Sequence, residues 1–144
     1  MSTPHPLDAL LPHRAPMILL DRARSASATA AECEVTVREG AMFVEAGRVS
    51  SVVFLEYMAQ AAAVVAGARA RMAGEAVRVG YLLGAREMTL LVDEARVGDV
   101  LTVRATLDYD DGAMAAYLTE VRGANDRLLA SAQLNVYLGG EAPP

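Results

Sequence analysis

The sequence is organised around one long apolar stretch, SSVVFLEYMAQAAAVVAGARARM, which runs from Ser50 to Met72. It contains no proline and is long enough for about six turns of α-helix. Its first half is apolar on nearly every face, which is typical of a buried helix. One charged residue, Glu56, lies inside this half, and Gln60 follows one turn later on the same face. Because carboxylates are almost never fully buried without a partner or a purpose, we predict that any activity depends on Glu56.

Length and composition exclude several classes of protein. A chain of 144 residues is expected to form one domain over residues 1–144, with loose ends at 1–6 and 139–144. The net charge of −5 argues against nucleic-acid binding. A single cysteine, Cys33, excludes an intramolecular disulfide, and with only two histidines no metal site is expected. There is no signal-peptide pattern and no apolar run of about 18 residues without a charge, so we predict a soluble cytoplasmic protein.

The segments before the helix are predicted to be short. Leu7 to Leu11 can form one helical turn, and the apolar run MILLDR at 17–22 is interpreted as a strand. Residues 28–37 alternate between apolar and polar side chains, which predicts a half-buried strand with Cys33 in the core. Residues 38–49 have no clear period and are interpreted as the connection to the helix.

The helix itself is expected to begin at an N-cap formed by Ser50 or Ser51 and to end near Gly74. Four strand-like runs follow, separated by turns, at 77–91, 100–109, 113–121 and 128–138. In the second run, five side chains are predicted to face inward: Leu101, Val103, Ala105, Leu107 and Tyr109. Two strands, one buried helix and four antiparallel strands together predict an α+β fold in which a curved sheet wraps around the helix.

Two motifs in this layout resemble those of a known family. The run LPHRAPMILLDR at 11–22 is similar to the opening of bacterial 3-hydroxyacyl-carrier-protein dehydratases, and EYMAQA at 56–61 resembles the Glu-x-x-Ala-Gln-Ala segment of their central helix. With Gly80 and the turn at 97–99, the similarity covers most of the chain. The resemblance implies the hotdog fold, a curved antiparallel sheet around one long helix.

The resemblance also implies a dimer with an interface tunnel for an acyl chain, which acyl carrier protein delivers on phosphopantetheine, and no further cofactor. In that family a loop histidine and the helix carboxylate of the other subunit act as acid and base. Glu56 matches the carboxylate, but Met42 stands where the histidine would be, and Ser51 and Val52 replace the Pro-Gly at the helix start. A methionine cannot transfer a proton, and each positioned proton-transfer group is worth roughly 10²–10⁴-fold in rate.

The chain more closely resembles a divergent branch of this family, the dehydratase-like proteins of aryl polyene pathways. These share the LPHRAPM opening, the Glu-Tyr-Met-Ala-Gln stretch and a Gly-x-Leu-Leu-Gly segment, here Gly80 to Gly84. This resemblance implies action on 3-hydroxyacyl thioesters of acyl carrier protein. The dimer would be either a homodimer or a heterodimer with a histidine-bearing dehydratase subunit.

Each candidate residue also has a structural interpretation. Glu56 is the candidate acid or base, and otherwise a structural carboxylate bonded to Gln60 or to the backbone. His13 could replace the loop histidine, although we favour a loop histidine bonded to backbone, because the family has it beside its catalytic histidine. N–H groups near Ser51 and Val52 could bind a thioester oxygen. Met42 and Gln60 are candidates for lining or supporting the substrate tunnel.

Two other functions stay open. A hotdog thioesterase would use Glu56 to activate water, and a noncatalytic subunit would only bind acyl carrier protein or a dehydratase subunit. Met42 favours the noncatalytic subunit. A charge kept inside an apolar helix favours catalysis, because burying it without a use costs several kcal/mol. We therefore favour an enzyme, a dehydratase-like lyase.

Overall fold

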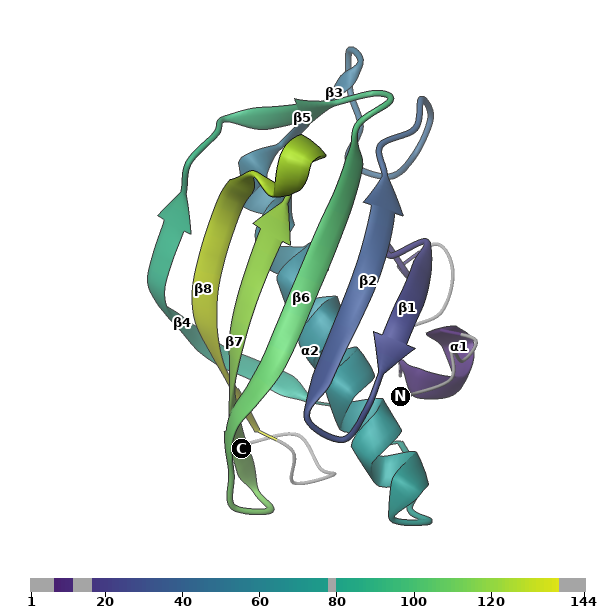
Figure 1. Cartoon of the computed structure of the whole chain (residues 1–144), viewed down its shortest axis with the longest axis vertical. Helices are drawn as coiled ribbons and strands as arrows, with labels where there is room; N and C mark the ends of the chain where they lie inside the picture. Colours follow the sequence, from purple (N-terminus) through teal and green to yellow (C-terminus); the bar gives the residue numbers. More distant parts are fainter. Residues whose placement is uncertain (1–6, 12–16, 78–79, 138–144) are drawn as a thin grey trace.

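A curved antiparallel sheet encloses one long helix (Figure 1). This computed structural model describes residues 7–11, 17–77 and 80–137. The sheet has six strands in the order β1-β2-β6-β7-β8-β4, and every neighbouring pair is antiparallel. In that order the strands are Arg22–Ala26, Ala30–Thr36, Val100–Asp110, Met114–Arg122, Leu128–Tyr137 and Tyr81–Leu90. The two edges of the sheet are therefore β1 and β4.

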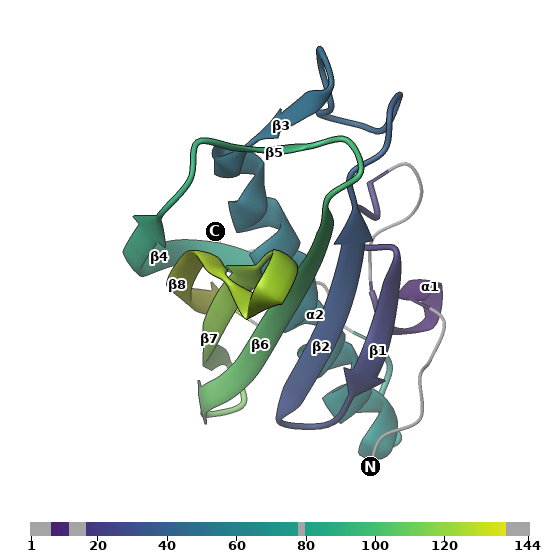
Figure 2. The same cartoon turned by 45° about the horizontal axis from the view of Figure 1, so that its top comes forward.

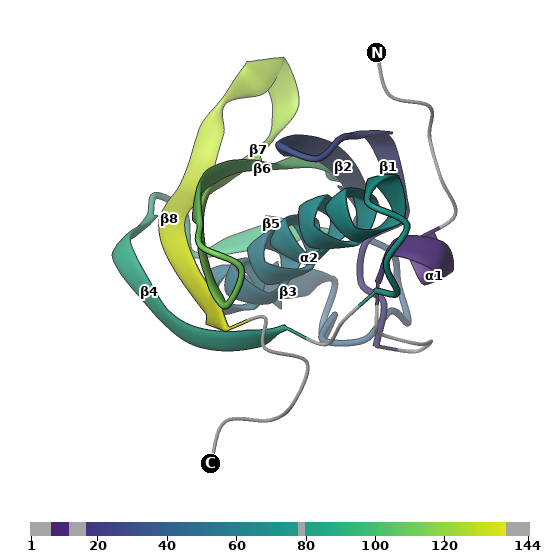
Figure 3. The ribbon, with the colours of Figure 1, turned by 90° about the horizontal axis from the view of Figure 1, so that it is seen from below.

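Helix α2, Phe54–Met72, lies in the hollow of this sheet, as Figure 3 shows from below. Its side chains Phe54 and Met58 are fully buried, and they share one core with the inward-facing Leu101 and Val103 of β6. Each such side chain stabilises the fold by roughly 1.5–3 kcal/mol when it leaves water. The α+β hotdog arrangement predicted for the sequence is confirmed.

Local sequence determines both ends of α2. The Ser50 hydroxyl accepts a hydrogen bond from the Val52 N–H at 3.2 Å and so caps the 3₁₀ turn Ser51–Val53 that leads into the helix. At the other end Gly74 has a φ of +72°, which glycine adopts without steric cost. The predicted end near Gly74 is confirmed. The predicted serine cap belongs to the 3₁₀ turn, whereas α2 itself begins at Phe54, after Val53, without a side-chain cap.

The short helix α1, Leu7–Leu10, packs directly on α2. Leu10 and the following Leu11 are buried in the core. A Cβ atom at Gly67 would lie only 1.9 Å from the carbonyl oxygen of Leu10. Only glycine therefore allows the two helices to come this close.

Residues 17–21 are not a strand, contrary to the prediction for 17–22. β1 begins only at Arg22, and the backbone just before it bonds to a side chain of α2 instead. The Leu19 N–H donates to Gln60 Oε1 at 2.8 Å, and Gln60 Nε2 donates to the Met17 carbonyl at 2.7 Å. A buried amide thus satisfies backbone groups that a strand would have paired.

The sequence prediction also missed a two-stranded ribbon over the N-terminal end of α2 (Figure 2). β3, Arg48–Ser50, pairs with β5, Glu94–Arg96, and each strand has three residues, too few for an alternating pattern. Beside them the Val97 N–H donates to the Gly47 carbonyl at 2.9 Å. The ribbon therefore holds the loop before α2, which the sequence presents as a simple connection.

The predicted inward face of β6 is right at its beginning and wrong at its end. Leu101, Val103 and Ala105 are buried, but the side chain of Tyr109 is 55% exposed. The register between β6 and β7 shifts between Leu107 and Tyr109. Such a bulge reverses the alternation of side chains, so Tyr109 faces outward.

Cys33 lies on the inner face of β2 and is a core residue, as predicted. Burial, together with the negative charge of Glu32, raises the pKa of its thiol to about 12. The thiol therefore stays protonated and unreactive at neutral pH.

By length and hydropathy, the run from Ser51 to Met72 could cross a membrane, contrary to the expectation from its charges. In the folded chain, however, 61% of its most apolar window is buried. The run is thus the core helix of the domain, which fits the predicted soluble protein.

Candidate functional site

Glu56 lies in the first turn of α2 and is partly buried. Its position at the N-terminal end of the helix places a negative charge where the helix dipole favours one. One turn later, Gln60 Nε2 donates a hydrogen bond to Glu56 Oε1 at 3.1 Å. The carboxylate is therefore held in one orientation by its own helix.

The amide of Gln60 is fully buried and makes three hydrogen bonds. Its two N–H groups go to Glu56 and to the Met17 carbonyl, and its oxygen accepts from the Leu19 N–H. Gln60 thus ties the segment before β1 to the carboxylate. Met17 and Leu19 were not anticipated as part of the site, and the dehydratase-like opening motif that contains them was the available signal.

The first residues of the helix present less free backbone than expected. Ser51 is buried, and its N–H donates to the Asp93 carbonyl at 2.9 Å. The N–H of Val52 is bonded to the Ser50 hydroxyl. A thioester oxygen would have to displace these partners. The side chain of Val52, in contrast, is 68% exposed.

Met42 lies in the loop between β2 and β3, where the dehydratases carry their histidine. Two residues of this loop, Phe43 and Ala46, have φ values of +69° and +54°. This left-handed conformation is uncommon for residues other than glycine, and such strain concentrates at functional sites. The loop is thus a defined structure that presents Met42 and Phe43, with 37% and 49% of their side chains exposed.

A cavity of about 140 Å³ lies under this loop and is lined by Met42 and Tyr57, among others. Asp21 and Arg38 also line it, and the Asp21 carboxylate accepts a hydrogen bond from the Thr36 N–H at 2.5 Å. Burial, with a contribution from the charge of Asp21, raises the pKa of Tyr57 to about 12. The phenol therefore stays protonated and can only donate or accept hydrogen bonds.

Among the described residues, Glu56 does not line the cavity under Met42. Tyr57, the next residue of α2, does line this cavity.

Two further expectations concern His13 and metals. His13 lies outside the described residues, so its role stays a prediction. In the part of the chain that the structure describes, no three histidine, cysteine or acidic side chains are grouped as metal ligands would be.

Comparison with known proteins adds to this geometry. The ApeP-like family model, described as ApeP dehydratase, matches residues 5–142. A comparison with curated protein sequences gave no match. The chain is similar to a chain of the dehydratase heterocomplex ApeI:P from Xenorhabdus doucetiae, with 30% identity, 95% of this chain and 93% of that chain covered, and a TM-score of 0.88.

More distant solved structures share the fold. A hypothetical thioesterase from Streptococcus pneumoniae, solved with coenzyme A, is 11% identical over 84% of this chain and 87% of that chain, with a TM-score of 0.66. The Escherichia coli PaaI protein is 15% identical over 80% of each chain, with a TM-score of 0.63. At such identities the likeness shows the hotdog fold alone. The family match and the 30% identical structure show more: this chain is a dehydratase-like protein and belongs to the ApeP-like dehydratase family, the aryl polyene branch that its motifs indicate.

Proposed function

We propose that this chain supplies the carboxylate of a dehydratase site that a histidine-bearing partner subunit completes. The substrate would be a 3-hydroxyacyl thioester of acyl carrier protein. The observation that carries the proposal is the contrast between two positions of the site. Glu56 is held in place by Gln60, whereas the loop position of the histidine holds Met42, which cannot transfer a proton.

The reaction requires two proton transfers. A base removes the proton from the carbon next to the thioester carbonyl, and an acid protonates the hydroxyl on the next carbon, which leaves as water. The product is the enoyl thioester. Glu56 would carry one transfer and the histidine of the partner subunit the other. In this proposal the substrate arrives on phosphopantetheine, no other cofactor takes part, and the protein acts in the cytoplasm.

Strand β4 is the surface that we assign to the partner. It is an edge strand, paired with β8 on one side only within the described chain. An exposed apolar edge strand is a template for pairing with another chain and invites aggregation when it is left open. The apolar side chains on and directly after β4 are between 36% and 53% exposed: Leu82, Leu83, Met88, Leu90 and Leu91.

Similarity to one chain of the ApeI:P heterocomplex supports a heterodimer over a homodimer. In a homodimer of this chain, every interface site would pair Glu56 with Met42 and would lack the second acid or base. In a heterodimer, the partner subunit would supply the missing histidine at one of the two interface sites.

The test is reconstitution. The purified protein, alone and mixed with a histidine-bearing dehydratase subunit, is given a 3-hydroxyacyl-acyl-carrier-protein substrate. Loss of water from the acyl group is followed by mass spectrometry and thiol release by a thiol reagent. We expect enoyl product from the mixture only, and a loss of roughly 100-fold or more with Glu56→Gln. Glu39→Gln, at an exposed glutamate after β2, is the matched control.

The other outcomes separate the competing functions. Product from this protein alone would contradict a shared site. Released thiol would indicate the thioesterase. If the mixture formed enoyl product equally fast with Glu56→Gln, this chain would be a noncatalytic subunit. The presence of Met42 at the histidine position is compatible with that function as well.

The partner surface has its own matched pair of variants. Leu83 on β4 and Leu118 on β7 are 51% and 50% exposed. Leu83→Glu is expected to abolish co-elution with the dehydratase subunit, because a charge would be buried at the interface. Leu118→Glu is expected to leave it intact. The reverse result would place the interface on the outer face of the sheet.

A further inference from the structure

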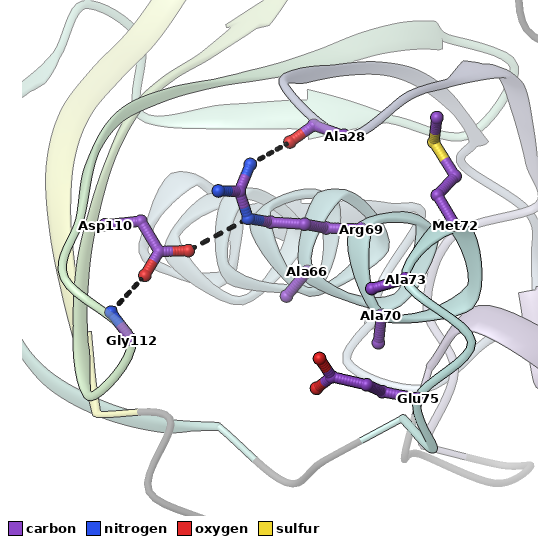
Figure 4. A pocket seen from close by; sticks show the side chains of 9 residues that line it. All are labelled: Ala28, Ala66, Arg69, Ala70, Met72, Ala73, Glu75, Asp110 and Gly112. Carbon is purple, nitrogen blue, oxygen red and sulfur yellow. Dashed lines mark hydrogen bonds and ion pairs between the residues drawn. The ribbon is translucent and has the colours of Figure 1, made fainter.

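Two cavities in the described part of the chain differ in whether their polar groups already have partners. The larger one, of about 520 Å³, lies beside Arg69 toward the C-terminal end of α2 (Figure 4). There the guanidinium bonds to Asp110 Oδ2 at 3.1 Å and to the Ala28 carbonyl at 3.3 Å, so the fold itself uses its donors. The cavity under Met42 is smaller, about 140 Å³, but Tyr57 in its wall has an unused hydroxyl.

Tyr57 is an almost fully buried phenol. Only 4% of the residue is exposed, and its ring stacks on Phe54 with the ring centroids 5.8 Å apart. Within the described residues, the Tyr57 hydroxyl makes no hydrogen bond. Buried tyrosine hydroxyls usually have a partner, and one without a partner calls for an explanation. This hydroxyl is therefore available to a molecule that enters the cavity.

Asp21 adds a carboxylate to the lining of the same cavity. Its Oδ2 atom accepts a hydrogen bond from the Thr36 N–H at 2.5 Å and lies 3.7 Å from Arg38 Nη2. In the part of the chain that the structure describes, Asp21 Oδ1 accepts no hydrogen bond, and the carboxylate is not bonded to Tyr57. The phenol and the carboxylate thus line one cavity, and both can bond to the same small group.

The rest of the lining defines which group fits. Most of it is apolar, with Ile18, Val35 and Val44 among its members. The volume is below the roughly 300–1,000 Å³ of pockets that enclose a whole ligand, so the cavity takes one part of a molecule. A charged group of either sign would lose its hydration against these side chains. A neutral hydroxyl group can accept from Tyr57 and donate to Asp21.

We propose that the cavity under Met42 binds the 3-hydroxyl group and the adjacent carbons of a 3-hydroxyacyl thioester, with the hydroxyl between Tyr57 and Asp21. The identity of this ligand rests on the proposed function. The cavity is a separate site, because Glu56 does not line it among the described residues. The enoyl product lacks the hydroxyl, so the cavity selects the substrate over the product. Neither Met42 nor a protonated phenol is a base, so the bound group keeps its water.

The test measures binding to the full chain without a partner subunit. The N-acetylcysteamine thioesters of 3-hydroxybutyrate, butyrate and crotonate are titrated into isotope-labelled protein, and backbone amide shifts are followed by NMR. We expect the hydroxylated thioester to shift the amides of Val37, Ala41 and Val44, which line the cavity. The other two lack the hydroxyl and are expected to bind about tenfold more weakly. Equal affinities, or no shift at these amides, would overturn the proposal and leave the cavity to water.

Variants test the assigned contacts. Tyr57→Phe removes a hydroxyl that has no hydrogen bond in the described chain, so the fold should persist. The affinity for the hydroxylated thioester should fall about tenfold, to that of the butyryl thioester, whose own affinity should not change. Tyr137→Phe on β8 lies outside the cavity lining and is the matched control.

Asp21→Asn tests the carboxylate. It keeps a side-chain oxygen for the Thr36 N–H but removes the charge that strengthens a hydrogen bond from the ligand. The preference for the hydroxylated thioester should fall at least about threefold. A preference that survived both Tyr57→Phe and Asp21→Asn would refute the site.

Failure of this proposal and failure of the dehydratase proposal give different results. Selective binding in the cavity without enoyl product from the reconstituted mixture would contradict only the shared dehydratase site. Enoyl product from the mixture without selective binding by this chain would contradict only the site at Tyr57 and Asp21.

Discussion

Gln60 Nε2 lies 3.1 Å from Glu56 Oε1, one turn back on the same helix, and donates a hydrogen bond to it. The same amide holds the backbone of Met17 and Leu19. The orientation of the carboxylate and the position of the segment before β1 are therefore coupled through a single side chain.

Gln60→Ala is expected to lower the free energy of unfolding by roughly 2–4 kcal/mol, because it leaves buried backbone groups of residues 17 and 19 without partners. Chemical denaturation measures this. Turnover of the reconstituted mixture should fall as well. Gln133→Ala, at a partly exposed glutamine on β8, is the control and should change neither quantity appreciably.

Gly67→Ala is expected to destabilise the fold by roughly 2–4 kcal/mol, because the added methyl group would overlap the Leu10 carbonyl oxygen and push α1 off α2. Thermal unfolding of the protein alone tests this. Gly84→Ala adds the same methyl group where no atom lies within 4 Å. If both variants unfolded at the same temperature, the close contact of α1 with α2 would be wrong.

Met42→Leu should leave the turnover of the reconstituted mixture within about threefold, because a methionine takes no part in proton transfer. Initial rates of enoyl formation measure this. A drop comparable with that of Glu56→Gln would give Met42 a direct role in substrate binding.

We expect the protein to unfold at alkaline pH because Tyr57 and Tyr117 are buried. Burial raises the pKa of each to about 12, above the ordinary value of 10. Protonation is thus favoured in the folded state, so this stabilisation is complete below pH 10 and is lost as the pH rises toward 12. Ultraviolet titration should show two of the five tyrosines ionising only as the circular dichroism signal of the fold disappears. Smooth ionisation of all five in the folded protein would contradict their burial.

We expect the hairpin carboxylate of Asp111 to make the folded state less stable in acid. Its carboxylate accepts hydrogen bonds from the N–H groups of Met114 and Ala113, which hold the pKa of Asp111 below its ordinary value of 3.8. The contribution is present above that ordinary value and is lost as the pH falls through the lowered pKa. The stability difference between the original protein and Asp111→Asn should therefore shrink below about pH 4. Asp108→Asn, at an exposed residue of the same hairpin, measures the effect of removing a charge alone.

The parts of the fold that the sequence predicted are those with a long, regular pattern. The strands β2, β6, β7 and β8 show alternating periods, and α2 comes from one long apolar run without proline that ends near Gly74. The prediction failed where a distant partner decides the structure. Residues 17–21 look like a strand, but Gln60, about 40 positions later, takes backbone hydrogen bonds of Met17 and Leu19.

The candidate site likewise has a part that the sequence predicted and a part that it did not. Glu56 and Gln60 were identified from one local motif, and their contact is a property of one helix turn. Two cavities could not be predicted from the sequence: the one under Met42 and a second one that Arg69 and Asp110 help to line. Each is closed by segments from separate parts of the chain, such as Ala28, α2 and the hairpin at Asp110, whose meeting depends on the curvature of the whole sheet.

Cys33 makes the chain a reporter of its own unfolding. Its thiol is fully buried between the sheet and α2 and is the single thiol of the sequence. A thiol reagent can reach it only after β2 separates from the core, so the labelling rate follows the fraction of molecules that are open at any moment. Each variant discussed above can therefore be ranked by one covalent reaction under native conditions. A partner or ligand that binds the folded state would slow the labelling of Cys33, so its binding could be compared with the effects of the variants.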